Sequence, residues 1–80
     1  MNERAESLGQ REELRRRRDI IETEVKSHRD SLRAALPITA DAADIESEYV
    51  MRLAISLNEK VQELRGVNRK IAILEQHLGL

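Results

Sequence analysis

Residues at intervals of three or four positions form a mainly apolar stripe in each of two long segments, the spacing that lines one face of an α-helix. In the first segment the stripe consists of Leu14, Ile21, Val25, His28, Leu32 and Ala35. In the second it consists of Val50, Ala54, Leu57, Val61, Leu64, Ile71 and Leu78. Leucine or isoleucine stands at every seventh position from Leu57 to Leu78, a repeat typical of coiled coils. The pattern therefore predicts two long amphipathic helices.

A single proline separates the two segments. Pro37 cannot continue a helix, and it also disfavours helical geometry at Leu36. We therefore predict helices over about residues 3–35 and 40–78, joined by a turn at 36–39. Such a short connection makes the two helices antiparallel neighbours. The predicted fold is all-α, with the whole chain forming one antiparallel, coiled-coil-like two-helix hairpin.

Both ends of the second helix carry sequence signals. Thr39 or Asp41 can cap its N-terminus, because short polar side chains accept hydrogen bonds from the free backbone N–H groups there. Gly79 follows the last residue of the apolar stripe and suits the left-handed conformation in which many helices end. The second helix is therefore expected to stop at Leu78.

The predicted turn also fixes which residues of the two helices lie level. If the chain folds just after the proline, level residues have numbers that sum to about 77. His28 then lies level with Tyr49, and we expect a hydrogen bond between them. Gly9 lies level with Asn68, close to Gly66. Because glycine costs about 1 kcal/mol inside a helix, two glycines at one level predict a bend or a close approach of the backbones.

The second helix carries more apolar residues than the first helix can cover. Opposite its C-terminal half the first helix offers mainly Ala5, Leu8 and Leu14. A single helical hairpin is also marginal in size, and oligomerisation is a usual remedy. We therefore predict pairing of two hairpins into a four-helix bundle dimer. The expected oligomer interface consists of Leu53, Leu57, Leu64, Val67, Ile71, Leu74 and Leu78.

Charge predicts how the two copies are oriented. Residues 1–18 and 60–80, at the open end of the hairpin, contain 10 Lys and Arg against 6 Asp and Glu, a net charge of +4. Residues 19–59, at the turn end, contain 4 Lys and Arg against 9 Asp and Glu, a net charge of −5. Head-to-tail packing brings opposite signs together, which favours an antiparallel homodimer. Asn68 is a polar residue expected at the helix seam, where such residues set register and partner number.

Four consecutive arginines occupy positions 15–18 of the first helix. Successive helical residues point about 100° apart, so this run cannot form one basic face. A modest basic belt is expected from Arg11, Arg15, Arg18, Lys60 and Arg65. Acidic residues are interleaved with the belt, and there is no aromatic platform for bases. The belt is therefore read first as contacting acidic protein groups, and second as contacting phosphate.

Composition argues against several classes of function. The chain contains no cysteine, which excludes disulfides and thiolate metal sites, and its net charge is only −1. No catalytic or metal-binding motif is present, and neither a cofactor nor a metal is expected. The longest apolar stretch, residues 50–57, is interrupted by Arg52, so we expect no membrane segment and a cytoplasmic location.

Two functions remain as hypotheses. The first is a non-enzymatic adaptor that forms a homo-oligomer and holds a further partner protein by coiled-coil contacts. The alternative is a nucleic-acid-binding regulatory hairpin dimer that uses the arginine-rich belt. The sequence leaves open the choice between dimer and tetramer.

Overall fold

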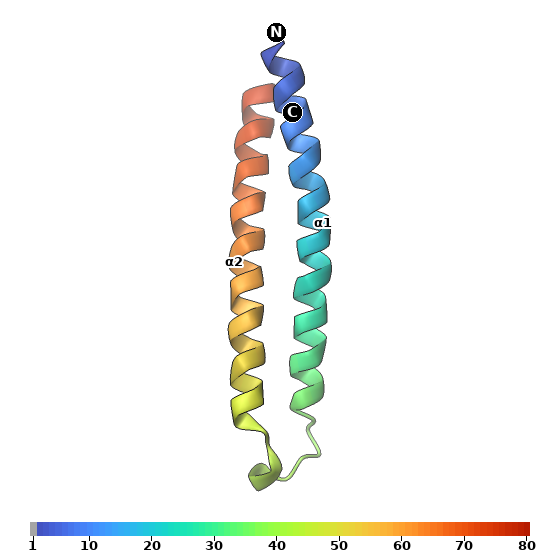
Figure 1. Cartoon of the computed structure of the whole chain (residues 1–80), viewed down its shortest axis with the longest axis vertical. Coiled ribbons are helices and arrows are strands. Elements are labelled where there is room, and N and C mark those ends of the chain that lie inside the picture. Colours follow the sequence, from blue (N-terminus) through green and yellow to red (C-terminus); the bar gives the residue numbers. More distant parts are fainter. Residues whose placement is uncertain (1) are drawn as a thin grey trace.

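The computed structural model describes residues 2–80 and consists of two long helices packed side by side (Figure 1). Helix α1 spans Glu3–Ala35 and helix α2 spans Ser47–Leu78, and they run antiparallel as a rod of 63 × 18 × 14 Å. A short 3-10 helix, η1, covers Ala42–Asp44 at the turn. The predicted all-α fold with two packed helices is confirmed.

An unbroken heptad pattern forms the seam between the helices. On α1 the half-buried and buried positions of the seam are Ser7, Arg11, Leu14, Arg18, Ile21, Val25, His28, Leu32 and Ala35. On α2 they include Val50, Leu53, Leu57, Lys60, Leu64, Val67, Ile71, Leu74 and Leu78. Steps of three and four alternate throughout both series, as in a coiled coil. Ala54, which we had placed in the stripe of the second helix, is exposed instead.

The most buried part of the seam lies towards the open end of the hairpin. Ile21, Val67 and Ile71 form its fully buried cluster. Leu14, Val25 and Leu64 are partly buried and pack against this cluster. Burial of such side chains contributes roughly 1.5–3 kcal/mol each, so this cluster is the main apolar anchor of the hairpin.

The outer ends of both helices are capped. The Asn2 side chain accepts hydrogen bonds from the backbone N–H groups of Arg4 and Ala5, at 3.0 and 3.3 Å. At the other end, Gly79 adopts a left-handed conformation with φ of 73°. The N–H groups of Gly79 and Leu80 donate to carbonyl groups of the last helical turn, the paired bonds of a Schellman motif. The predicted stop at Gly79 is confirmed.

The turn is longer than we predicted. Helix α2 begins at Ser47 instead of about residue 40, and neither Thr39 nor Asp41 caps it. Its N-terminal flanking residue, Glu46, makes no side-chain capping bond. The physical reason lies in the packing, because Val50 is the first residue of α2 that reaches the seam. Residues 41–49 are all exposed, so they bury little apolar surface to offset the cost of helix formation.

The longer turn changes which residues lie level. Three ion pairs cross from one helix to the other: Arg11–Glu75, Arg17–Glu63 and Lys60–Glu24. Their residue numbers sum to 86, 80 and 84, so level residues sum to about 83. The predicted sum of 77 is therefore wrong, because the extra turn residues move each helix along the other.

Two contacts predicted from the old register are also wrong. His28 makes no hydrogen bond with Tyr49 in the described chain; its Nδ1 donates to the backbone carbonyl of Glu24 at 2.7 Å. Gly9 and Gly66 do not mark a close approach of the two backbones. A Cβ atom at Gly9 would meet nothing within 4 Å, and one at Gly66 would meet only the Arg69 side chain at 3.9 Å.

Candidate protein-interaction surface

The structure covers much of the apolar surface that we expected to face a second chain. Val67, Ile71 and Leu78 are buried within the single hairpin. The apolar surplus that we expected among Val67, Ile71, Leu74 and Leu78 is therefore smaller than predicted, since of these four only Leu74 remains half-buried. In the observed register Ile21 packs with Val67 and Ile71, and the partly buried Leu14 packs against this cluster. These buried side chains stabilise the hairpin of a single chain, without a contribution from a partner.

The other residues of the expected interface lie at the edges of the seam. Leu53, Leu57, Leu64 and Leu74 are half-buried. Their remaining exposed area is available to another chain, and that contact stays a prediction. Asn68 is exposed and lies outside the seam, so its side chain does not set the register between α1 and α2.

Large apolar side chains are nevertheless exposed elsewhere on the described chain. Most gather at the turn end: Leu36, Ile38, Ile45, Tyr49, Met51 and Ile55. Others lie nearer the open end: Leu8, Ile73, Leu80 and, towards the middle, Ile20. The exposure of the turn residues was not predicted from the sequence, because these residues belong to no periodic stripe. Apolar residues in a stretch without helical periodicity have no helix face that could bury them, and this pattern could have predicted their exposure.

One flank of the seam is filled by ion pairs of the chain itself. Lys60 Nζ lies 2.7 Å from Glu24 Oε2 and 3.5 Å from Glu63 Oε2. Arg17 Nη2 donates to Glu63 Oε1 at 2.9 Å. We call Arg17, Glu24, Lys60 and Glu63 the Lys60 flank. These charges satisfy one another and remain partly in water, so this flank offers little unpaired charge to a partner.

The ion pairs shift the pKa values of two of these groups. The hydrogen bond from Arg17, with help from the charge of Lys60, lowers the pKa of Glu63 below its ordinary value of 4.5. The hydrogen bond to Glu24 raises the pKa of Lys60. Both shifts favour the charged forms, so both stabilise the folded hairpin at neutral pH.

Replacing Glu63 with glutamine is expected to lower the thermal stability slightly at neutral pH. Because the folded pKa of Glu63 is lowered, its contribution is present above the unfolded pKa and is lost as pH falls through the folded pKa. The difference in melting temperature between wild type and Glu63→Gln should therefore shrink on acidification, as followed by circular dichroism. A difference that grows on acidification would contradict the assignment.

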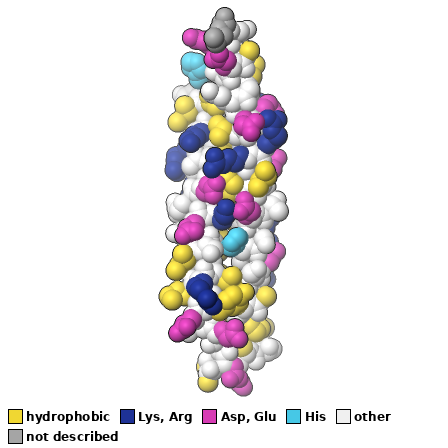
Figure 2. Space-filling view, in the orientation of Figure 1, with side chains coloured by type: hydrophobic (Ala, Val, Ile, Leu, Met, Phe, Trp, Pro, Cys, Tyr) yellow, Lys and Arg dark blue, Asp and Glu magenta, His cyan; other side chains and the backbone are white. Residues whose placement is uncertain are grey.

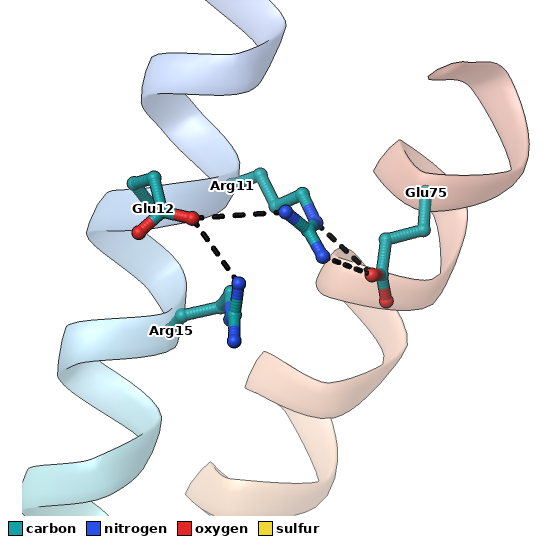
Figure 3. A network of polar contacts seen from close by, with 4 residues as sticks. All are labelled: Arg11, Glu12, Arg15 and Glu75. Atoms are coloured by element: carbon teal, nitrogen blue, oxygen red, sulfur yellow. Dashed lines mark hydrogen bonds and ion pairs between the residues drawn. The ribbon is translucent and has the colours of Figure 1, made fainter. Parts of the chain in front are cut away.

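Two arginines of the expected basic belt, Arg11 and Arg15, lie on the opposite flank (Figure 3). Arg11 Nε and Nη2 donate to Glu75 Oε2 at 3.0 and 2.7 Å. Glu12 Oε1 lies 3.6 Å from Arg11 Nη1 and accepts a hydrogen bond from Arg15 Nη1 at 3.2 Å. Carboxylates of the same chain therefore occupy both arginines. We call Arg11, Arg15, Arg18 and Glu22 of α1, with Arg65 and Glu75 of α2, the Arg11 flank.

The five-residue belt is only partly assembled. Arg11, Arg15, Arg18 and Arg65 share the Arg11 flank, because Arg65 lies on the same side of α2 as Glu75 at helical spacing. Lys60 is a seam residue whose ammonium group reaches the other flank, where it pairs with Glu24. Among residues 2–80, neither Arg18 nor Arg65 forms an ion pair.

The remaining arginines of the run behave as the helical geometry requires. Arg16 donates to Glu13 at 2.6 Å, and Arg17 turns to the Lys60 flank. The run therefore radiates around α1, and three of its four members are paired. Figure 2 shows the result on one face of the rod, where acidic, basic and hydrophobic side chains are interleaved. Such a face gives no long stripe of one sign.

Other kinds of site find little support in the described residues. Across residues 2–80 no three His, Asp or Glu side chains come together as a metal site. Neither described helix has an apolar stretch long enough to span a bilayer. An apolar surface groove lies beside Leu14, Ile73 and Leu74, with no pair of titratable groups in it. Comparison with family models, curated proteins and solved structures finds no match to this chain.

Proposed function

We propose that this chain is a non-catalytic interaction module that works as an antiparallel homodimer of hairpins and holds a further partner protein. The observation that carries the proposal is the mismatch between helix length and buried core. The two helices contain 33 and 32 residues, yet the buried hydrophobic residues are Ile21, Val67, Ile71 and Leu78. Small domains with so little core usually gain stability by oligomerisation.

Exposed apolar residues support the same conclusion. Ten large hydrophobic side chains are exposed in the described chain, and all but Ile20 lie towards one end of the rod or the other. A side-by-side dimer can cover several of them in one step. Apolar surface of this kind marks protein contacts more often than it marks small-molecule sites on a rod without a deep pocket. Residues left uncovered at the turn, such as Ile38, are then available to a different protein.

Charge favours the antiparallel orientation. With the observed register, residues 1–21 and 62–80 form the open half, with 9 Lys and Arg against 7 Asp and Glu, a net charge of +2. Residues 22–61 form the turn half, with 5 against 8, a net charge of −3. Asp41, Asp44, Glu46 and Glu48 form no ion pair in the described chain, so the negative end is free to meet a positive one.

Light scattering tests the dimer directly. We expect twice the chain mass of 9.2 kDa, with a dissociation constant that rises when salt screens the charges between the two copies. Unfolding should also shift to higher temperature as protein concentration increases, because a dimer is stabilised by mass action. A one-chain mass at concentrations up to about 1 mM would overturn the proposal.

The alternative, nucleic-acid binding, is favoured by one observation, the two unpaired arginines Arg18 and Arg65 on one flank. Two free arginines are few, since salt-dependent binding typically uses about 6–10 phosphate contacts. The alternative predicts binding that weakens steeply with salt and is lost in an Arg18→Glu, Arg65→Glu variant. Gel-shift measurements with RNA and DNA at physiological salt separate the two functions, and we expect no shift.

A further inference from the structure

A groove of about 280 Å³ lies at the turn end of the rod, where the end of α1 meets the start of α2. Ile45 and Tyr49 provide its larger apolar side chains, and both are exposed. Two carboxylates, those of Asp44 and Glu46, also line it. The rest of the lining consists of small side chains and a proline ring: Ala34, Ala35, Pro37 and Ala40. We call this groove the turn groove, and its small side chains leave room for an apolar side chain from a partner.

Backbone hydrogen bonds order the segment that forms the turn groove. The N–H group of Ala40 donates to the carbonyl of Pro37 at 3.1 Å. The N–H group of Asp44 donates to the carbonyl of Asp41 at 2.9 Å, within the short helix η1 and its N-terminal flank. A groove held in this way exists before a ligand arrives, so binding does not have to order the turn first.

The turn carries exposed apolar side chains as well as the groove. Residues 36–49 lie between the end of α1 and Val50, the first seam residue of α2. They contain four of the ten exposed large hydrophobic side chains of the described chain: Leu36, Ile38, Ile45 and Tyr49. Connecting segments usually carry polar and turn-forming residues instead. Apolar side chains that gather on the surface around a groove are typical of a protein-contact site.

Residues 36–49 are also strongly acidic. They contain no Lys, Arg or His, and their four acidic residues give a net charge of −4: Asp41, Asp44, Glu46 and Glu48. None of these carboxylates forms an ion pair among residues 2–80. With the neighbouring Arg33 and Arg52 included, the net charge is still −2. Figure 2 shows hydrophobic and acidic side chains at this end of the rod.

We propose that the turn groove binds a segment of another protein in which basic side chains flank a large apolar side chain. The inference rests on the proposed interaction module and states where its partner protein docks. The apolar side chain enters the groove beside Ile45 and Tyr49. Its basic neighbours meet Asp44 and Glu46, which have no partner of their own in the described chain, and form charge-assisted hydrogen bonds with them.

The charge and size of the groove disfavour other occupants. Carboxylates repel phosphate groups, so neither nucleic acid nor an anionic lipid surface is complementary to the turn groove. Its volume is below the roughly 300–1,000 Å³ of typical small-molecule pockets. A second copy packed side by side covers the long faces of the rod, whereas residues 36–46 lie beyond the seam at its end (Figure 1).

Selection from a library of random linear peptides displayed on phage tests the site without assuming a partner. The chain of 80 residues is immobilised and exposed to the library. We expect the enriched peptides to combine Lys or Arg with a large apolar residue. Enrichment of peptides without basic residues, or no enrichment over the uncoated support, would overturn the proposal. The most enriched peptide is then labelled and titrated with the chain by fluorescence anisotropy.

Removing the two carboxylates of the groove tests the charge contact. The double variant Asp44→Asn, Glu46→Gln is expected to raise the dissociation constant of that peptide about tenfold, since two ion pairs are lost. Asp19→Asn, Glu59→Gln removes the same charges from exposed positions further along the rod and is the matched control. At physiological salt these distant charges are screened, so the control should bind like the wild type. Equal weakening in both variants would contradict docking at the turn groove.

A pair of isoleucines tests the apolar contact. Ile45→Ser is expected to raise the dissociation constant of the selected peptide about tenfold, because apolar surface is no longer buried on binding. Ile73→Ser, at the open end, should leave the constant unchanged. Both isoleucines are exposed, so neither change removes a core side chain, and circular dichroism confirms that the helices remain. Equal losses at the two positions would place the contact elsewhere.

Light scattering on the same samples separates this inference from the proposed homodimer. A two-chain mass with a peptide that binds the carboxylate variant as tightly as the wild type overturns the docking site and leaves the homodimer. A one-chain mass with peptide binding that depends on Asp44 and Glu46 removes the homodimer and leaves the docking site. Dissociation of the dimer by the peptide would show that a second copy occupies the turn groove, which also overturns the proposal.

Discussion

Replacing Ile71 with alanine is expected to lower the free energy of unfolding by about 2–5 kcal/mol, the usual cost of removing a large side chain from a core. Ile71 is only 3% exposed and packs with Ile21 and Val67 in the buried cluster. Small domains are stable by roughly 5–15 kcal/mol, so this loss is a large fraction of the total. Urea denaturation followed by far-ultraviolet circular dichroism measures it.

The chain provides two matched controls for this prediction. Ile73 lies two residues further along α2 and is 66% exposed. On α1, Ile20 and Ile21 are adjacent and are 63% and 2% exposed. Alanine at Ile73 or Ile20 should change stability by no more than about 0.5 kcal/mol, whereas alanine at Ile21 should match Ile71→Ala. Equal losses at buried and exposed isoleucines would contradict the packing.

Periodicity predicted the helices well for a simple physical reason. The repeat from Leu57 to Leu78 presents one face of a helix at every turn, and only a long partner helix can cover such a face. Two such segments separated by one proline can bury their apolar faces against each other by forming a hairpin. The end of α2 at Gly79 could also be predicted from the sequence, because glycine adopts the left-handed conformation without the clash that a Cβ atom causes.

The register between α1 and α2 could not be predicted from the sequence, because it depends on where α2 begins. That start is decided by tertiary contact, as Val50 is the first residue that packs on α1, and not by the capping residues Thr39 and Asp41. A shift of a few residues then moved Ile21 opposite Val67 and Ile71 and buried them. Counting apolar residues on each helix therefore overestimated the surplus on α2.

Three residues of α2 that we assigned to the seam, Ala54, Val61 and Asn68, lie outside its alternating series. Ala54 and Val61 were assigned to the seam because they are apolar, and Asn68 was assigned there because polar residues can occupy seams. The structure shows the seam passing through Lys60 instead, whose ammonium group reaches Glu24 across it. Once Lys60 is recognised as a seam residue, the alternating steps of three and four pass by Ala54, Val61 and Asn68.

Replacing Gly9 and Gly66 with alanine is expected to stabilise the protein by about 1 kcal/mol each. Both lie inside helices, where glycine is less favourable than alanine by this amount. A Cβ atom has room at both positions. The melting temperature should rise by about 4–8 °C per kcal/mol for a domain of this size, measured at one protein concentration.

Gly79 supplies the opposite control, since its φ of 73° is a conformation that alanine rarely adopts. Gly79→Ala should lower stability by about 1 kcal/mol, through the strain of the left-handed conformation. The three substitutions are chemically identical, so their opposite signs would separate backbone conformation from any effect of the added methyl group. Destabilisation by Gly66→Ala would show that the helices approach more closely there than the structure has them.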